Sequence, residues 1–158
     1  MTPNIVLLEA RIRKELFQLE KLEAELKSVN KMKDLKFESV RSRVYASILH
    51  DFYSGIEKVF INIAREIDRS VPGTEGWHRQ LLEQMTLDIP SKRPAVIDNH
   101  LADQIHQYLS FRHRFRNLYG FELKPDKLEE LAQNMGGCLK QFKKSIEIFL
   151  EVVSNIVE

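Results

Sequence analysis

Apolar residues recur at intervals of three and four along nearly the whole chain, and this periodicity limits the fold more than any other feature. The longest runs cover residues 4–33, 40–68 and 126–153. Such spacing places apolar side chains on one face of an α-helix, whereas no segment shows the period of two that a β-strand requires. The sequence therefore predicts an all-α fold.

Turn-forming residues separate the runs and delimit two further helices. Segments 70–76 and 88–94 are rich in Pro and Gly and mark two breaks. A short helix is predicted over 77–87, with Thr74 or a neighbour as its N-cap. The next helix is predicted over 96–118, ending at Gly120 in the left-handed geometry of a C-cap.

The last helix is expected to start at Pro125 and Asp126, and Gly136–Gly137 is expected to weaken or bend it. Long helices joined by short breaks indicate an up-and-down bundle of four to five helices, in one domain over residues 1–158. The first and last helices are longer than one compact layer needs. A second copy of the chain is therefore expected to cover part of them, as a homodimer.

Composition excludes several classes of protein. With 30% charged residues, the chain has no segment of the roughly 18 apolar residues that a membrane span requires. Cys138 is the only cysteine, which excludes an internal disulfide and suits a reducing compartment. The first residues show no secretion signal, so a cytoplasmic protein is expected. The net charge of +1 argues against a wholly basic nucleic-acid binder and leaves room for a local basic patch.

The predicted fourth helix carries the most informative pattern. Its core side is expected to hold seven apolar or aromatic residues: Leu101, Ile105, Tyr108, Phe111, Phe115, Leu118 and Tyr119. Arg112 and Arg116 fall on one edge of this stripe. A polar stripe occupies the adjacent face: His106, Ser110, His113 and Asn117.

Three arginines, Arg112, Arg114 and Arg116, lie among these histidines and aromatic residues. Arginine forks match phosphate oxygens and aromatic rings stack on bases, so the pattern favours a phosphate or RNA ligand. A solvated basic helix face with ordinary surface histidines explains the same residues.

Segment 111–120, FRHRFRNLYG, resembles the signature of HepT-like toxins, a branch of the HEPN superfamily of small helical ribonucleases. The family pattern is Arg, four residues, His, one residue, Tyr. Segments 52–68 and 71–85 resemble the family's second and third helices, with five residues in familiar places: Gly55, Glu57, Trp77, His78 and Leu81. The resemblance covers about residues 47–128.

This resemblance implies a metal-independent endoribonuclease without a cofactor, acting as a dimer on RNA such as tRNA or mRNA. It also implies the toxin component of a toxin–antitoxin pair, neutralised by a cognate MntA-like nucleotidyltransferase antitoxin. By the same resemblance, Arg112 would hold the scissile phosphate with Arg114 and Arg116 beside it. The antitoxin would transfer AMP to Tyr119 and block the phosphate site.

Position 117 departs from the family pattern, because Asn117 stands where the motif has His. An amide hydrogen-bonds a phosphate but does not exchange protons near pH 7. Two interpretations stay open. In one, His113 supplies the acid/base group one turn earlier, or the surroundings of Asn117 assist the proton transfer, with His106 as a weaker candidate. In the other, the protein is catalytically impaired and binds the nucleotidyltransferase or RNA through the same surface.

Other patterns point to no further site. Glu75 and His78 have the Glu-x-x-His spacing of di-iron bundles, without the second copy and further carboxylates that such sites need. His100, His106 and His113 lack the i,i+4 spacing of zinc ligands. No metal site is predicted.

Two basic segments have ordinary explanations. Arg93 and His100 match the broader HEPN arginine–histidine spacing, but Pro94 and the loop context favour coincidence. Arg41 and Arg43 add to a basic groove or belong to a solvated helix face.

Overall fold

The computed structural model describes residues 3–32 and 38–156. Five α-helices follow one another: α1 (Pro3–Lys31), α2 (Glu38–Ile63), α3 (Trp77–Gln84), α4 (Asn99–Phe115) and α5 (Pro125–Ile156). A π-helical turn, η1 (Ala64–Asp68), extends α2, and a 3₁₀ turn, η2 (Gly120–Glu122), precedes α5. The described residues form no β-sheet, and the predicted all-α fold is confirmed.

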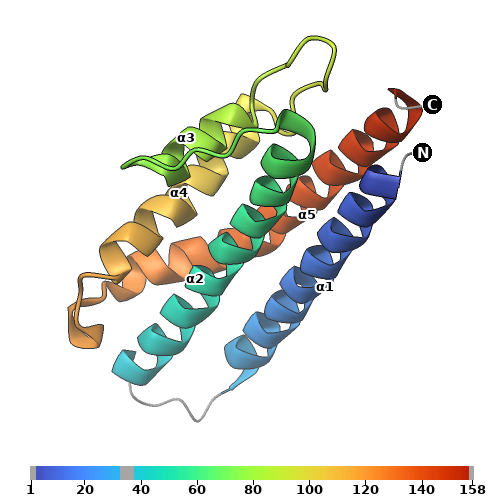
Figure 1. The fold of residues 1–158 in the computed structure, drawn as a ribbon. Helices are drawn as coiled ribbons and strands as arrows, with labels where there is room; N and C mark the ends of the chain where they lie inside the picture. The colour runs from blue at the N-terminus through green and yellow to red at the C-terminus, as the bar shows by residue number, and fades with distance from the viewer. Residues whose placement is uncertain (1–2, 33–37, 157–158) are drawn as a thin grey trace.

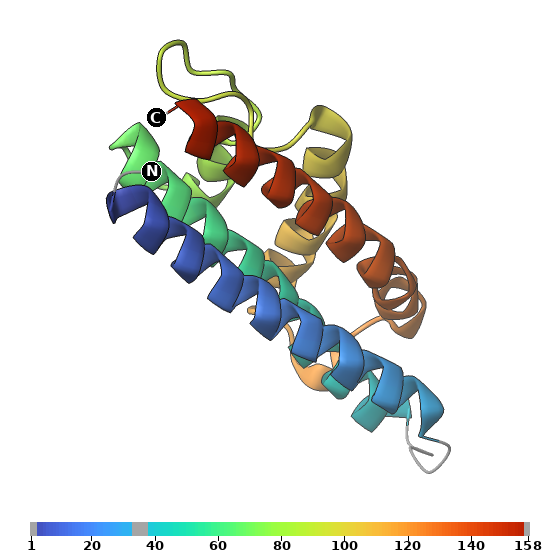
Figure 2. The same ribbon diagram turned by 90° about the vertical axis from the view of Figure 1, so that its right-hand side faces the viewer.

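Helices α1, α2, α4 and α5 alternate in direction and form an up-and-down bundle (Figure 1). Helix α2 lies at its centre and contacts α1, α3, α4 and α5. The short helix α3 packs against α2 and α4 (Figure 1). Both views place the two ends of the chain at the same end of the bundle, where α1 lies against α5 (Figure 2).

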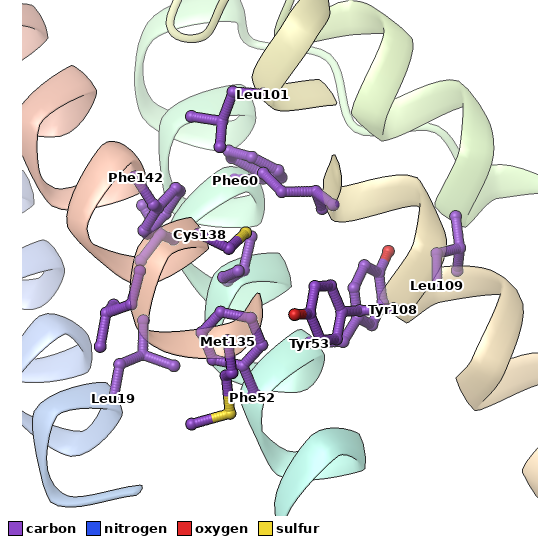
Figure 3. Packing of buried hydrophobic residues seen from close by; sticks show 14 of the residues in the cluster. Leu19, Phe52, Tyr53, Phe60, Leu101, Tyr108, Leu109, Met135, Cys138 and Phe142 are labelled. Carbon is purple, nitrogen blue, oxygen red and sulfur yellow. The ribbon is translucent and has the colours of Figure 1, made fainter. Parts of the chain in front are cut away.

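The core is built from the apolar stripes that the sequence predicts. Phe52 of α2 meets Tyr108 of α4 edge to face at 5.0 Å between ring centroids, and Phe60 meets Phe142 of α5 at 5.7 Å (Figure 3). Aromatic pairs in this geometry add about 0.5–1.5 kcal/mol to the burial of their surfaces. Gly55 lets α1 approach α2, because a Cβ there would stand 2.6 Å from Leu19 Cδ2.

Helix α4 ends earlier than predicted. Its last residue is Phe115, with Arg116 as the C-cap, so Asn117 and Tyr119 lie beyond the helix. Gly120 does not take the predicted left-handed conformation. It starts η2 instead, and its missing side chain makes room for the guanidinium of Arg43, which a Cβ would overlap.

Other boundaries also differ from prediction. Gly76, at φ 77°, is the N-cap of α3, and Thr74 contributes only its carbonyl, which accepts from the N–H of Trp77. Helix α4 starts at Asn99, where the Asp98 carboxylate accepts from the Leu101 N–H at 2.7 Å. Helix α5 starts at Pro125, as predicted, and remains helical through the glycine pair at 136–137.

A buried ion pair fixes the long connection between α3 and α4. Arg93 donates from Nε and one terminal nitrogen to the two carboxylate oxygens of Asp68, at 2.6 and 2.8 Å. Its remaining contacts are main-chain carbonyls of Gln84, Leu87 and Pro94. Arg93 is therefore a structural residue, and its spacing to His100 marks no second motif.

Among residues 3–32 and 38–156, no helix combines the length and apolar character that crossing a bilayer requires.

Candidate functional site

A groove of about 800 Å³ runs along the second half of α4. Its lining comes from three elements: Gly76, His78 and Arg79 at the start of α3; His106, Gln107, Leu109, Ser110, His113 and Arg114 of α4; and Lys127 of α5. The i, i+4 and i+7 spacing of His106, Ser110 and His113 places them on one face of α4. We call this cavity the α4 groove.

The α4 groove is strongly basic. Arg79, Arg114 and Lys127 line it together with three histidines, and none of the ten lining residues is acidic. A concave surface lined by positive charges raises the local concentration of an anionic ligand. Histidine supplies proton donors and acceptors near neutral pH. The groove therefore suits a phosphate-bearing ligand on which proton transfer is performed.

His78 enters the groove from a rigid support. Its Nδ1 lies 2.6 Å from Oε2 of Glu57, a buried residue of α2. The imidazole also stacks on Trp77, with ring centroids 3.7 Å apart. The ring is thus held by a hydrogen bond to a carboxylate group at one edge and by the face of an aromatic ring.

A polar row connects this pair to Arg112. Tyr53 precedes Glu57 by one turn of α2, and the Arg112 guanidinium lies 5.9 Å from the Tyr53 ring centroid. Burial, together with the Glu57 carboxylate, raises the pKa of Tyr53 far above its usual value, and the Arg112 charge opposes this shift. Arg112, Tyr53, Glu57 and His78 thereby join α4, α2 and α3.

Arg112 does not line the α4 groove but reaches toward α2. Its Nε is buried and makes no hydrogen bond in the described part of the chain. A buried donor without a partner costs about 1–3 kcal/mol. The described bundle therefore leaves this donor unsatisfied, as it does the acceptor Oε1 of Gln104.

A second cavity, of about 510 Å³, adjoins the α4 groove and shares His113, Arg114 and Lys127 with it. Asn117 and Leu118 line this cavity. The Asn117 amide donates to the main-chain oxygen of His113 at 3.2 Å.

Some of the predicted site residues line these cavities, and others do not. His113, Arg114 and Asn117 lie along the two joined cavities. Arg116 is exposed, and Arg112 lies on the side of α4 that faces α2.

The predicted core side of the fourth helix is correct only as far as the helix extends. Four of its residues are buried: Leu101, Ile105, Tyr108 and Phe111. Phe115 is half-buried, whereas Leu118 and Tyr119, beyond the end of α4, are exposed. Tyr119 is 70% exposed and stacks on the equally exposed Phe121, with ring centroids 5.4 Å apart.

The contact between His78 and Glu57 does not follow from the sequence pattern. The Glu-x-x-His spacing pairs His78 with Glu75, whereas its carboxylate partner in the fold is Glu57 of α2, twenty-one positions away. One signal was present: Glu57 interrupts the buried side of α2, between Ile56 and Phe60. Within the described ranges no three His, Cys, Asp or Glu side chains are placed to hold a metal ion.

A family model described as HepT-like protein matches residues 44–153 of this chain. The chain belongs to the HepT-like family. Among curated proteins and solved structures, no match was found. The region matched by the HepT-like model contains every residue of the α4 groove and of the polar row that joins His78 to Arg112.

Proposed function

We propose that this HepT-like protein is a metal-independent endoribonuclease and the toxin component of a toxin–antitoxin pair. The observation that carries the proposal is the α4 groove, which combines three histidines and three cations without a carboxylate. RNA offers both partners that such a groove needs: a charged backbone, and a 2′-hydroxyl next to each phosphate.

Arg112 is the proposed phosphate-binding residue, from its place next to His113 and outside the lining of the α4 groove. Arg114, which lines the groove, and the exposed Arg116 are the proposed further RNA contacts. Among the described residues the Arg112 guanidinium lies over the Tyr53 ring, and its Nε makes no hydrogen bond. A guanidinium held in place stabilises the negative charge that develops on the phosphoryl oxygens during cleavage. His113, in the wall of the groove, is proposed to protonate the leaving oxygen.

The proposed regulator is an MntA-like nucleotidyltransferase antitoxin that transfers AMP to Tyr119. The exposure of Tyr119 supports this assignment, because the hydroxyl must be accessible to a second enzyme. Incubation with ATP and the partner should add one AMP to wild-type protein and none to Tyr119→Phe, as measured by intact mass. Modification that persists in Tyr119→Phe contradicts the assignment.

We also propose that the protein forms a homodimer. Val6, Leu7 and Phe17 of α1 and Ile148 of α5 are exposed apolar residues on the two longest helices. Light scattering after size exclusion should give twice the chain mass of 18.6 kDa. A monomer at micromolar concentration contradicts this part of the proposal.

Cleavage of total RNA in the presence of EDTA tests the ribonuclease proposal. Wild-type protein should produce new RNA ends, and Arg112→Ala should produce at least about 100-fold fewer, as expected for loss of one transition-state contact. His100→Asn is a matched control, since His100 is exposed and its one side-chain hydrogen bond among the described residues is to Gln104, at 3.4 Å. Equal cleavage by Arg112→Ala contradicts the proposed mechanism.

One observation favours a second function, a catalytically impaired protein that binds RNA or the nucleotidyltransferase. Asn117 occupies the motif position, and its amide is bonded to a main-chain carbonyl. Under this alternative the wild-type protein is inactive, and Asn117→His creates metal-independent cleavage. Cleavage by the wild type excludes the alternative.

A further inference from the structure

We propose that His78, oriented by Glu57, is the general base of the α4 groove and takes the proton from the attacking 2′-hydroxyl. This inference rests on the proposed ribonuclease function. It assigns a catalytic role to a residue outside the α4 motif segment, in a chain whose motif position 117 is Asn.

The hydrogen bond to Glu57 fixes which nitrogen of His78 is available. An ionised carboxylate only accepts, so Nδ1 carries the proton that it donates across the 2.6 Å contact. In the neutral ring, Nε2 then holds a lone pair. No hydrogen bond occupies Nε2 within the described residues, and the side chain, about 25% exposed, lines the α4 groove.

Glu57 also stabilises the product of the proton transfer. Its side chain is about 10% exposed, so its charge acts on the imidazolium with little screening by water. In hydrolases with a catalytic triad, a buried carboxylate next to the catalytic histidine acts in the same way. It fixes the tautomer of the imidazole and stabilises the imidazolium that forms. Glu57 is therefore a positioning residue, because it acts through His78.

The reaction step balances without any further reactant. The 2′-oxygen forms a bond to the adjacent phosphorus as its proton moves to Nε2 of His78. The bond from phosphorus to the 5′-oxygen breaks, and that oxygen takes a proton from protonated His113. The products are a 2′,3′-cyclic phosphate and a 5′-hydroxyl, and the two histidines return to their starting states by exchange with water.

The chemical environment of the groove supports this assignment over a purely structural contact. A histidine that only ties α2 to α3 has no need to face a cavity lined by two more histidines and three cations. A purely structural contact also predicts a different mutational result. In that case a variant whose side chain at position 78 keeps the hydrogen bond to Glu57 should be fully active.

His78→Asn separates the two explanations. The Asn amide nitrogen occupies nearly the position of Nδ1 and can still donate to Glu57, but nothing replaces Nε2 as a proton acceptor. Metal-free cleavage of RNA should fall by about 10²–10⁴-fold, the usual contribution of a general base. Affinity for an oligonucleotide with 2′-deoxyribose at the cleaved position should change less than about threefold.

Glu57→Gln tests the positioning role. Glutamine keeps an acceptor oxygen for Nδ1 but loses the charge that favours the imidazolium. We expect kcat to fall at least about tenfold with KM unchanged. The assignment is overturned if His78→Asn and Glu57→Gln lose stability and activity to the same extent and KM rises in both variants. That result supports a purely structural contact.

The decisive comparison includes wild type, His78→Asn, Arg112→Ala and the control His100→Asn in one assay. Cleavage by wild type and His100→Asn, with loss in the other two, supports the assignment. Wild-type rates in His78→Asn with loss in Arg112→Ala overturn the role of His78 and leave the ribonuclease function standing. No cleavage by the wild type overturns both.

A binding measurement checks the position of His78 independently of activity. In protein labelled with ¹⁵N-histidine, the Nε2 resonance of His78 should shift when the 2′-deoxy-substituted oligonucleotide saturates the protein. A resonance that stays in place in the saturated complex contradicts the assignment.

Discussion

Two arginines of this HepT-like protein illustrate opposite uses of the same side chain. Arg93 is 3% exposed, and its guanidinium donates to both oxygens of Asp68 and to three main-chain carbonyls. Arg112 is half-buried, and its Nε has no hydrogen-bond partner among the described residues. The contacts of Arg93 show that it holds the fold, and the unpartnered Nε of Arg112 agrees with the proposal that this residue binds a phosphate.

The sequence separates these two arginines only by their context. Arg93 precedes His100 at the broader HEPN spacing but stands next to Pro94, and Arg112 precedes a motif position that holds Asn117 instead of histidine. The difference arises from tertiary contacts, because Asp68 lies twenty-five positions before Arg93. Substituting each arginine in turn tests whether Arg93 is needed for stability and Arg112 for RNA cleavage.

The largest effect is expected from Arg93→Met. It leaves the Asp68 carboxylate buried without a counter-charge, which costs about 3–5 kcal/mol of unfolding free energy. The melting temperature, measured by circular dichroism, should fall by about 10 °C. The double variant Asp68→Leu/Arg93→Met should recover part of the loss, and a single variant as stable as the wild type contradicts the structural role of Arg93.

Arg112→Met should show the opposite behaviour. Its removal eliminates an unpaired buried donor, so the free energy of unfolding should change by less than about 1 kcal/mol. Metal-free RNA cleavage should nevertheless fall at least about 100-fold. A destabilisation as large as that of Arg93→Met shows that the two arginines are alike and contradicts the comparison.

A third arginine extends the comparison to the surface. Arg13 of α1 forms a two-contact ion pair with Glu147 of α5, at 2.7 and 3.1 Å, with both side chains about half exposed. Such pairs contribute about 0–1 kcal/mol, so Glu147→Gln should cost less than 1 kcal/mol in urea unfolding. A cost near that of Arg93→Met contradicts the ranking of contacts by burial.

The pH dependence of this surface pair has a defined sign. The hydrogen bond from Arg13 lowers the pKa of Glu147 below its ordinary value. The stabilisation is therefore present above the unfolded pKa, near 4.3, and is lost as the pH falls through the lower folded value. Glu147→Gln should remove this small acid-dependent contribution.

The smallest effect concerns Cys138, which is buried in the core beside α4 (Figure 3). Burial raises the pKa of its thiol to about 12. At pH 8 the native protein should therefore react with iodoacetamide much more slowly than the unfolded chain. Labelling should accelerate in Arg93→Met, because its lower stability raises the population of unfolded chain, and should not accelerate in Arg112→Met. Fast labelling of the wild type contradicts the burial of Cys138.

The helices could be predicted from periodicity because each long helix buries one stripe of apolar side chains. The end of α4 could not be predicted, since Asn117 and Leu118 are compatible with a helix. The helix ends at Phe115, and the chain then continues to η2, where Gly120 packs against Arg43 of α2. The site was predicted only along α4. His78 and Glu57 come from different helices, so their contact requires the tertiary fold.

The proposed catalytic site is tested most directly by counting the 2′,3′-cyclic phosphate ends that wild type, Arg112→Met and His78→Asn produce from RNA in EDTA. We expect new ends with the wild type and at least about 100-fold fewer with either variant, at melting temperatures within a few degrees of the wild type. Ends formed at equal rates by all three proteins, or by none, would contradict the proposed site.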